Sequence, residues 1–433
     1  MPSNASAADH IQDLGSFVSA SPSSFHAVHE AARRLDAAGF TGLEELQPWE
    51  GGPGNYYVIR DGALIAWVTP ANAGATSGFN ILGAHTDSPS FKLKPKPTTG
   101  KFGWLQAGVE VYGGPLLNSW LDRELQLAGR LVMRDGTQHL TNTGPLLRFP
   151  QLAIHLDRTV NEGLTLSKQQ HMNPIFGLGD PAGEDLLGLL ASRVEGAAVD
   201  AAEIGGYDVV VADTQAPAVF GANGEFFASG RLDNLSSTHA GLVALLAHSA
   251  AAPANGPIAV LAAFDHEEIG SNSRSGACGP FLEDVLTRIS DGFGASVSQR
   301  RQAFSASFCV SADAGHAVHP NYAERHDPTN RPLLNGGPLL KINANQRYAT
   351  DATGAALWAR LCEESGVRYQ EFVSNNDIPC GSTIGPLTAT RLGIRTVDVG
   401  VPLLSMHSAR ELCGVEDPHL LATVVERFFA SAV

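Results

Sequence analysis

Apolar and polar positions alternate with two different periods in the first part of the chain. Residues 23–39 place apolar side chains three and four positions apart, between a serine and a glycine, which predicts an amphipathic helix. Residues 55–70 form two runs rich in β-branched and aromatic side chains, joined by Asp61 and Gly62, which predicts a hairpin. The apolar run 79–83 predicts a further strand that ends in a polar cluster.

The pattern changes between about residues 89 and 230. Apolar and polar residues alternate there in several short runs, which is typical of half-buried antiparallel strands. A helical pattern occurs mainly at 183–193. We therefore expect residues 89–230 to form a separate β-rich domain.

After residue 230, strand and helix patterns take turns. Continuous apolar runs at 256–265, 307–313 and 393–402 predict buried strands. Helical patterns and a further strand occur between and around these runs, at residues 231–250, 351–365, 369–373 and 415–432. This alternation predicts an α/β fold with a mostly parallel central sheet that is flanked by helices on both faces.

Composition and charge narrow the choice of function. The chain has 433 residues, 17% of them charged, and a net charge of −15, so its surface should repel nucleic acid. We expect no membrane association, because no apolar run of about 18 residues occurs and the first residues lack the pattern of a signal peptide. The five cysteines contain no CxxC pair, which favours free thiols and a cytoplasmic protein.

Histidine and acidic residues follow several of the predicted strands or open a predicted helix. Ligands of open α/β sheets bind beyond the carboxyl ends of the strands, so we expect these side chains to meet at one edge of the sheet. Taken one at a time, each has a simpler explanation as a helix cap or a solvated turn. The residues are His85, Asp87, Asp233, Glu267, Glu268, Asp313 and His407.

Two histidines and three carboxylates suit a pair of zinc ions, with cobalt or manganese as chemically acceptable substitutes. Two neighbouring glutamates cannot point the same way from an extended backbone. One of Glu267 and Glu268 could therefore bind metal while the other acts as a base on water. Asp87 could hold the imidazole of His85 through its other nitrogen.

These residues lie in segments that resemble the aspartyl aminopeptidase family of dinuclear zinc exopeptidases. The resemblance runs along nearly the whole chain and is carried by residues 83–95, 117–124, 150–158, 229–235, 265–271, 311–322, 376–386 and 398–411. It implies that His85, Asp233 and Asp313 bind a first zinc ion. It also implies that Asp233, Glu268 and His407 bind a second, so that Asp233 bridges the two ions.

The same resemblance implies further roles. Glu267 would be the general base and Asp87 would orient His85. His155 would reach into the active site of a neighbouring subunit, and Lys341 would line the pocket for the first side chain of a peptide with a free N-terminus. A buried lysine favours a carboxylate, so the expected substrates begin with Asp or Glu.

The resemblance also implies an architecture. Residues 1–88 and 231–433 would form the catalytic domain, and residues 89–230 an inserted domain through which dimers form and assemble into a tetrahedral dodecamer. Three alternatives stay open: an aminopeptidase of neutral or broad specificity, another dinuclear hydrolase such as a carboxypeptidase or an amidohydrolase, and a non-catalytic assembly protein with a vestigial site.

Overall fold

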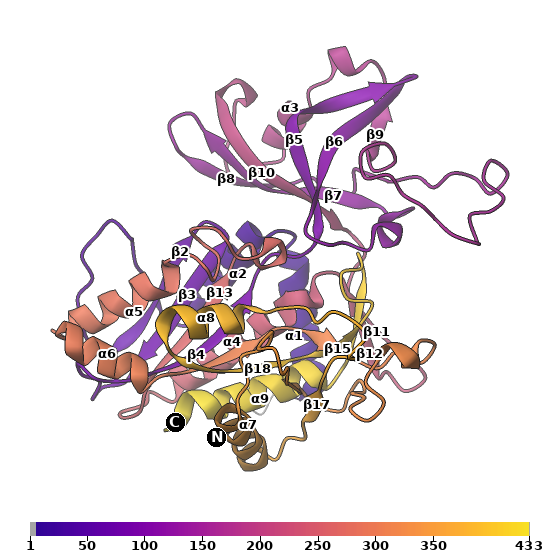
Figure 1. Cartoon of the computed structure of the whole chain (residues 1–433). Coiled ribbons are helices and arrows are strands. Elements are labelled where there is room, and N and C mark those ends of the chain that lie inside the picture. The colour runs from indigo at the N-terminus through magenta and orange to yellow at the C-terminus, as the bar shows by residue number, and fades with distance from the viewer. Residues whose placement is uncertain (1–5, 433) are drawn as a thin grey trace.

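A nine-stranded sheet forms the centre of the larger part of the molecule in the computed structural model, which describes residues 6–432 (Figure 1). Its four middle strands β13, β4, β14 and β18 are parallel, and antiparallel pairings occur toward both edges. The strands in their order across the sheet are β1 (Thr41–Gly42), β2 (Gly54–Arg60), β3 (Ala63–Thr69), β13 (Ile258–Phe264), β4 (Phe79–His85), β14 (Phe308–Ala312), β18 (Arg395–Gly400), β16 (Leu339–Lys341) and β17 (Gln370–Phe372).

Helices cover both faces of this sheet, which confirms the predicted fold class. One face packs against α1 (Ala7–Ala20), α2 (Ser24–Ala37), α4 (Leu232–Ala250), α7 (Ala352–Ser365) and α9 (Asp417–Ala430). The other packs against α5 (Phe281–Gly292), α6 (Val297–Ser305) and α8 (Ile384–Leu392). Strand β3 shows why its apolar run is continuous: Leu64 and Ala66 belong to the first core, and Ile65 and Trp67 to the second.

Local sequence signals explain the early elements. Ser23 caps α2 by accepting a hydrogen bond from the backbone N–H of His26, and the apolar face of the helix is buried, as the pattern predicted. Asp61 adopts a left-handed φ of 57° in the turn between β2 and β3, as expected for an Asp-Gly hairpin. Helix α1, which was not predicted, begins with a capping box formed by Ser6 and Asp9.

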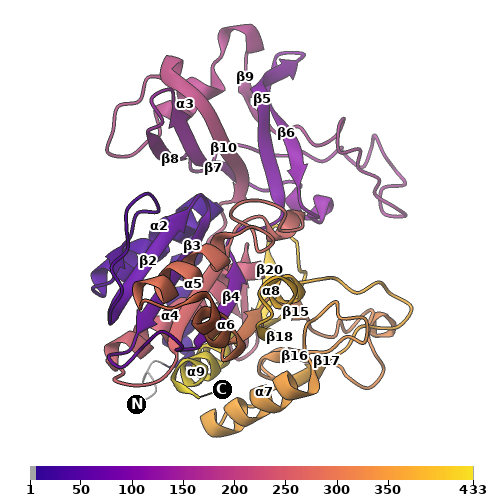
Figure 2. The same cartoon turned by 60° about the vertical axis from the view of Figure 1, so that its left-hand side comes forward.

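A six-stranded sheet with antiparallel pairings forms the smaller part of the molecule, above the carboxyl end of β4 (Figure 2). Its strands in order are β8 (Gln138–Asn142), β7 (Leu125–Met133), β10 (Ile204–Asp213), β5 (Ser90–Lys101), β6 (Trp104–Tyr112) and β9 (Ile175–Leu178), and the short helix α3 (Leu186–Ala191) packs into the same core. We call this part, residues 90–213, the insert, and the remaining described residues the larger part.

A third sheet contains strands from two regions of the chain: the segment that follows the insert, and residues beyond 314. Its strands in order are β11 (Ala218–Phe220), β12 (Phe226–Ser229), β20 (Glu411–Gly414), β19 (Pro402–Leu404) and β15 (Gly315–His316). The segment 218–229 therefore pairs with the larger part rather than with the sheet of the insert. Across residues 6–432, no helix combines the length and apolar character needed to cross a bilayer.

Candidate metal centre

Four of the predicted site residues lie at the ends of three neighbouring strands, at one edge of the central sheet. His85 is the last residue of β4, Asp313 follows β14, and Glu267 and Glu268 follow β13 in a short 3-10 turn. Phe264 pairs with His85 in the parallel register of β13 and β4, so both strands end at the same level. The 3-10 turn differs from the extended backbone considered from the sequence, and in it both glutamates face the same cluster as His85.

Asp233 and His407 reach the same edge from other elements. Asp233 lies in the first turn of α4, where its backbone departs from helical geometry, and His407 lies in the loop between β19 and β20. All the ligands predicted from the resemblance thus lie in one cluster. Within it, two groups of three donors each have their ligand atoms within 4.8 Å of one another: His85, Asp233 and Asp313, and Asp233, Glu268 and His407.

The two carboxylate oxygens of Asp233 face different histidines. Its Oδ1 is 3.3 Å from Nε2 of His85, and that nitrogen is 3.4 Å from Oδ1 of Asp313. Its Oδ2 is 3.6 Å from Nε2 of His407, and that nitrogen is 3.4 Å from Oε2 of Glu268. Asp233 therefore offers one oxygen to each group.

These spacings fit zinc better than they fit direct hydrogen bonds. Two ligand atoms in a tetrahedral zinc site, each about 2.0–2.2 Å from the ion, lie about 3.3–3.6 Å apart. Direct hydrogen bonds of this kind are usually about 2.7–3.2 Å long. Within the described part of the chain, the buried Oδ1 of Asp233 and Oε1 of Glu268 have no hydrogen-bond partner. Buried polar atoms are normally hydrogen-bonded, so these two carboxylates fit a site that binds a cation.

Electrostatics also favour a cation here. Burial raises the pKa of Glu267 to about 8, and nearby carboxylates add to this effect. Burial likewise raises the pKa of Glu268 well above its usual value, and the charge of Asp233 raises it further. Burial and mutual repulsion thus disfavour the ionised forms of both glutamates. A divalent cation bound among them would stabilise these ionised forms.

Asp87 supports the cluster without belonging to either group of donors. Its backbone carbonyl lies 3.1 Å from Nδ1 of His85, an arrangement that leaves Nε2 directed at Asp233 and Asp313. Its carboxylate accepts hydrogen bonds from the backbone N–H groups of Glu267, at 3.0 Å, and Glu268, at 3.1 Å. Asp87 thus fixes the positions of one histidine and both glutamates at once.

The insert contributes contacts that the sequence did not indicate. The hydroxyl of Tyr112, at the end of β6, donates to Asp87 at 2.8 Å. The backbone carbonyl of Gly114 lies 3.1 Å from Nδ1 of His407, and the N–H of Leu116 donates to the carbonyl of His407 at 2.9 Å. No motif around Tyr112 predicts these contacts, because they depend on how the insert packs against the larger part.

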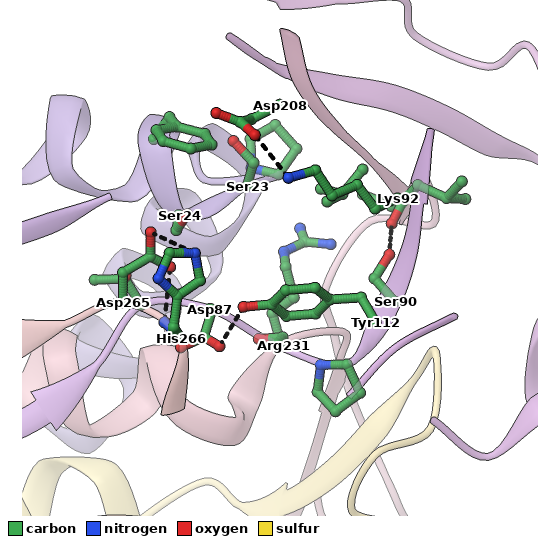
Figure 3. A pocket seen from close by; sticks show the side chains of 18 of the residues that line it. Ser23, Ser24, Asp87, Ser90, Lys92, Tyr112, Asp208, Arg231, Asp265 and His266 are labelled. Carbon is green, nitrogen blue, oxygen red and sulfur yellow. Dashed lines mark hydrogen bonds and ion pairs between the residues drawn. The ribbon is translucent and has the colours of Figure 1, made fainter. Parts of the chain in front are cut away.

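A cavity of about 280 Å³, lined in part by Asp87, lies between the insert and the larger part (Figure 3). The insert contributes Tyr112 and the ion pair of Lys92 with Asp208, at 2.6 Å. The larger part contributes Arg231 and Asp265, and burial raises the pKa of Asp265 to about 6. The cavity meets the metal centre through the shared residues Asp87 and Asp233, so the position of the insert bears directly on the cluster.

Lys341 and His155 lie in contrasting surroundings. Lys341 is 1% exposed, and its Nζ donates to the carbonyl of Ala314 at 2.6 Å and lies 3.8 Å from Oδ2 of Asp313. His155 is exposed on an irregular segment, residues 150–174, that extends outward from the insert (Figure 1). Within one chain, the structure brings Lys341 to the metal cluster and leaves His155 away from it.

Comparison with known proteins decides the family. A family model described as aminopeptidase I zinc metalloprotease (M18) matches residues 17–429. This chain belongs to the M18 family. It is therefore a hydrolase of the aminopeptidase type.

Curated members of the M18 family resemble the chain over almost its whole length. A protein named "Probable M18 family aminopeptidase 2" from Streptomyces coelicolor is 54% identical, and the match covers 97% of each chain. A protein of the same name from Pseudomonas aeruginosa is 45% identical over 97% of this chain and 98% of its own. The matches thus extend over both the larger part and the insert.

Solved M18 structures share the fold. A structure described as a complex of Ape4 and Nbr1 has a TM-score of 0.94 and 38% identity, and covers 98% of this chain and 86% of that one. The S. cerevisiae mApe1 dodecamer has a TM-score of 0.85 and 30% identity, and covers 97% and 96%. The fold of this chain is therefore that of M18 aminopeptidases, and one of these relatives is a dodecamer.

Proposed function

We propose that this M18 aminopeptidase binds two zinc ions and removes N-terminal residues from peptides, with a preference for Asp and Glu. His85, Asp233 and Asp313 would hold one ion, and Asp233, Glu268 and His407 the other. The observation that carries the proposal is that the two oxygens of Asp233 face separate groups of donors at the spacing of zinc ligands.

The residues around the ions divide the chemistry among them. When bound, the two ions polarise the scissile carbonyl and lower the pKa of the attacking water. Glu267, which belongs to neither of the two groups proposed to hold the ions but lies in the cluster of His85, accepts the proton of that water and passes it to the leaving amine. The carboxylate of Asp87 accepts a hydrogen bond from the backbone N–H of Glu267, so the base is positioned by the same residue whose backbone carbonyl lies against His85.

A panel of aminoacyl reporter substrates tests this function. We expect hydrolysis of free-amine substrates, loss of hydrolysis when metal is removed, and recovery when zinc is restored. A peptide with an acetylated N-terminus should not be cleaved. Cleavage of the acetylated peptide from its carboxyl end would instead indicate a carboxypeptidase.

The acidic preference rests on Lys341. Its ammonium is buried beside the metal ligand Asp313, where a carboxylate of the first substrate residue would be attracted strongly. We expect Lys341→Met, which keeps the apolar stem and removes the charge, to lower kcat/KM for Asp substrates at least about tenfold more than for Leu substrates. Equal losses on both would indicate broad specificity.

We also propose that the insert mediates a homo-oligomer, a tetrahedral dodecamer in which His155 completes the site of a neighbouring subunit. The apolar side chains around His155 support an interface, because Leu152, Ile154 and Leu156 are 60%, 48% and 74% exposed. The dodecamer of the related mApe1 supports the same assembly. The cysteines, which are free thiols, suit a cytoplasmic location.

A charge placed on this segment tests the assembly. We expect Leu156→Asp to yield smaller species by light scattering, with most of the activity per subunit lost, since each site would lack its neighbour's histidine. Leu46→Asp, on the 95% exposed Leu46 of the larger part, serves as the control and should leave both unchanged. Full activity in a monomeric Leu156→Asp protein would contradict the shared site.

A further inference from the structure

Glu411 lies between two of the proposed metal ligands although it belongs to neither donor group. It is the first residue of β20 and is 2% exposed. Its Oε2 accepts a hydrogen bond from the backbone N–H of Asp233 at 2.9 Å, and its Oε1 accepts one from the backbone N–H of His407 at 2.8 Å. One carboxyl group thus joins two segments that are far apart in the sequence.

Both of these segments need such support. His407 has a left-handed φ of 64° and Ser405 one of 57°, conformations that cost energy in residues with side chains. On the other side, Arg231, two residues before Asp233, has a φ of 59°. A buried acceptor that satisfies the N–H groups of Asp233 and His407 therefore stabilises an otherwise unfavourable path of the backbone.

The sheet fixes Glu411 in this place. Glu411 pairs with Ser229 in the antiparallel register of β12 and β20. Strand β12, which precedes Asp233 in the chain, therefore lies beside β20, which begins at Glu411. His407 belongs to the loop that precedes the same strand. The strand pairing and the two hydrogen bonds of the carboxyl group thus connect the segments that carry Asp233 and His407.

We propose that Glu411 is a positioning residue for the second ion, which holds Asp233 and His407 at the separation that this ion requires. This inference rests on the proposed dinuclear site. The ligands that belong only to the first ion, His85 and Asp313, make no contact with Glu411 among the hydrogen bonds of the described residues. The effect of Glu411 should therefore be larger for the second ion than for the first.

Zinc retention in the presence of a graded chelator, measured by elemental analysis of the whole protein, tests the proposal. Glu411→Gln is nearly isosteric, but its amide NH₂ group must face one of the two N–H donors and so loses a hydrogen bond. We expect the affinity for the second ion to fall by about 10–100-fold, the usual cost of disturbing a group that supports a metal ligand, with a smaller change for the first. Excess zinc should restore kcat.

Asp417→Asn is the matched control. Asp417 is also fully buried and accepts two backbone N–H groups, those of Asn335 at 2.7 Å and Gly337 at 2.9 Å, but neither residue belongs to the metal cluster. Both variants should lose thermal stability, and only Glu411→Gln should lose the second ion. Glu411→Asp, whose shorter side chain reaches one N–H at most, provides a second variant if Glu411→Gln does not fold, and should show the same selective loss.

Two results would overturn the positioning role. One is an unchanged affinity for both ions in a folded Glu411 variant, and the other is an equal loss of the second ion in Asp417→Asn. If the wild-type protein itself bound fewer than two ions, the proposed dinuclear site would be contradicted before the role of Glu411 is tested. The measurement therefore separates the two proposals.

Discussion

Glu267→Gln should retain both zinc ions and lose most of its turnover, with kcat reduced by about 10²–10⁴-fold and KM little changed. The amide keeps the size of the side chain, but it cannot accept a proton from the attacking water, and a general base typically contributes a factor of this size. Steady-state kinetics at matched zinc content would measure the effect. Turnover near the wild-type rate would show that another group is the base.

The pH profile gives a second readout of the same variant. Burial raises the pKa of Glu267 to about 8, and a neighbouring cation would lower it by favouring the carboxylate. Since only the ionised form accepts a proton, wild-type kcat/KM should fall as the pH falls through the pKa of this group in the loaded enzyme. In Glu267→Gln, the part of this decline that is due to Glu267 should be absent.

Asp233→Ala should have the second large effect, because one side chain is expected to serve both ions. We expect zinc affinity to fall by more than about 100-fold and activity to fall to background. Loss of a residue that only supports a metal ligand typically costs up to about 100-fold in affinity, so loss of a ligand should cost more. Zinc should raise the melting temperature of the wild-type protein by mass action but not that of the variant. Retention of two tightly bound ions would remove Asp233 from the bridging position.

The metal-free Asp233→Ala protein offers a control for folding. The charge of Asp233 raises the pKa of the buried Glu268 and Glu411, but His85 and His407 hold the pKa of Asp233 itself well below its usual value. Its removal therefore relieves repulsion among the acids and also leaves two imidazoles without their partner, so we expect the variant without metal to stay folded but to be less stable than the metal-free wild-type protein. A variant that is unfolded without metal would instead indicate that Asp233 has a structural role of its own.

Much of the fold was predictable because its signals are local. The hairpin at Asp61, the continuous apolar runs of β13 and β14, and the long helices α4, α7 and α9 each follow from periodicity and turn residues within a short window. Helix α1 also has a local signal, the Ser6–Asp9 capping box followed by apolar residues at helical spacing, although it was not predicted. Helices α5, α6 and α8 were likewise not predicted.

The residues that support the metal cluster were much harder to predict than the candidate ligands. The candidate ligands follow strands or open a helix, and parallel strands bring such positions together. Tyr112 and Gly114 act from the insert, and Glu411 acts through a strand pairing with β12. Their roles depend on contacts between segments distant in sequence, and no periodicity of one segment encodes such a contact.

Anomalous diffraction at the zinc absorption edge, from crystals of the zinc-loaded protein, tests the central claim most directly. The account predicts two zinc peaks about 3.5–4 Å apart, one on each side of the Asp233 carboxylate. A single peak, or two peaks of which neither contacts Asp233, would contradict it.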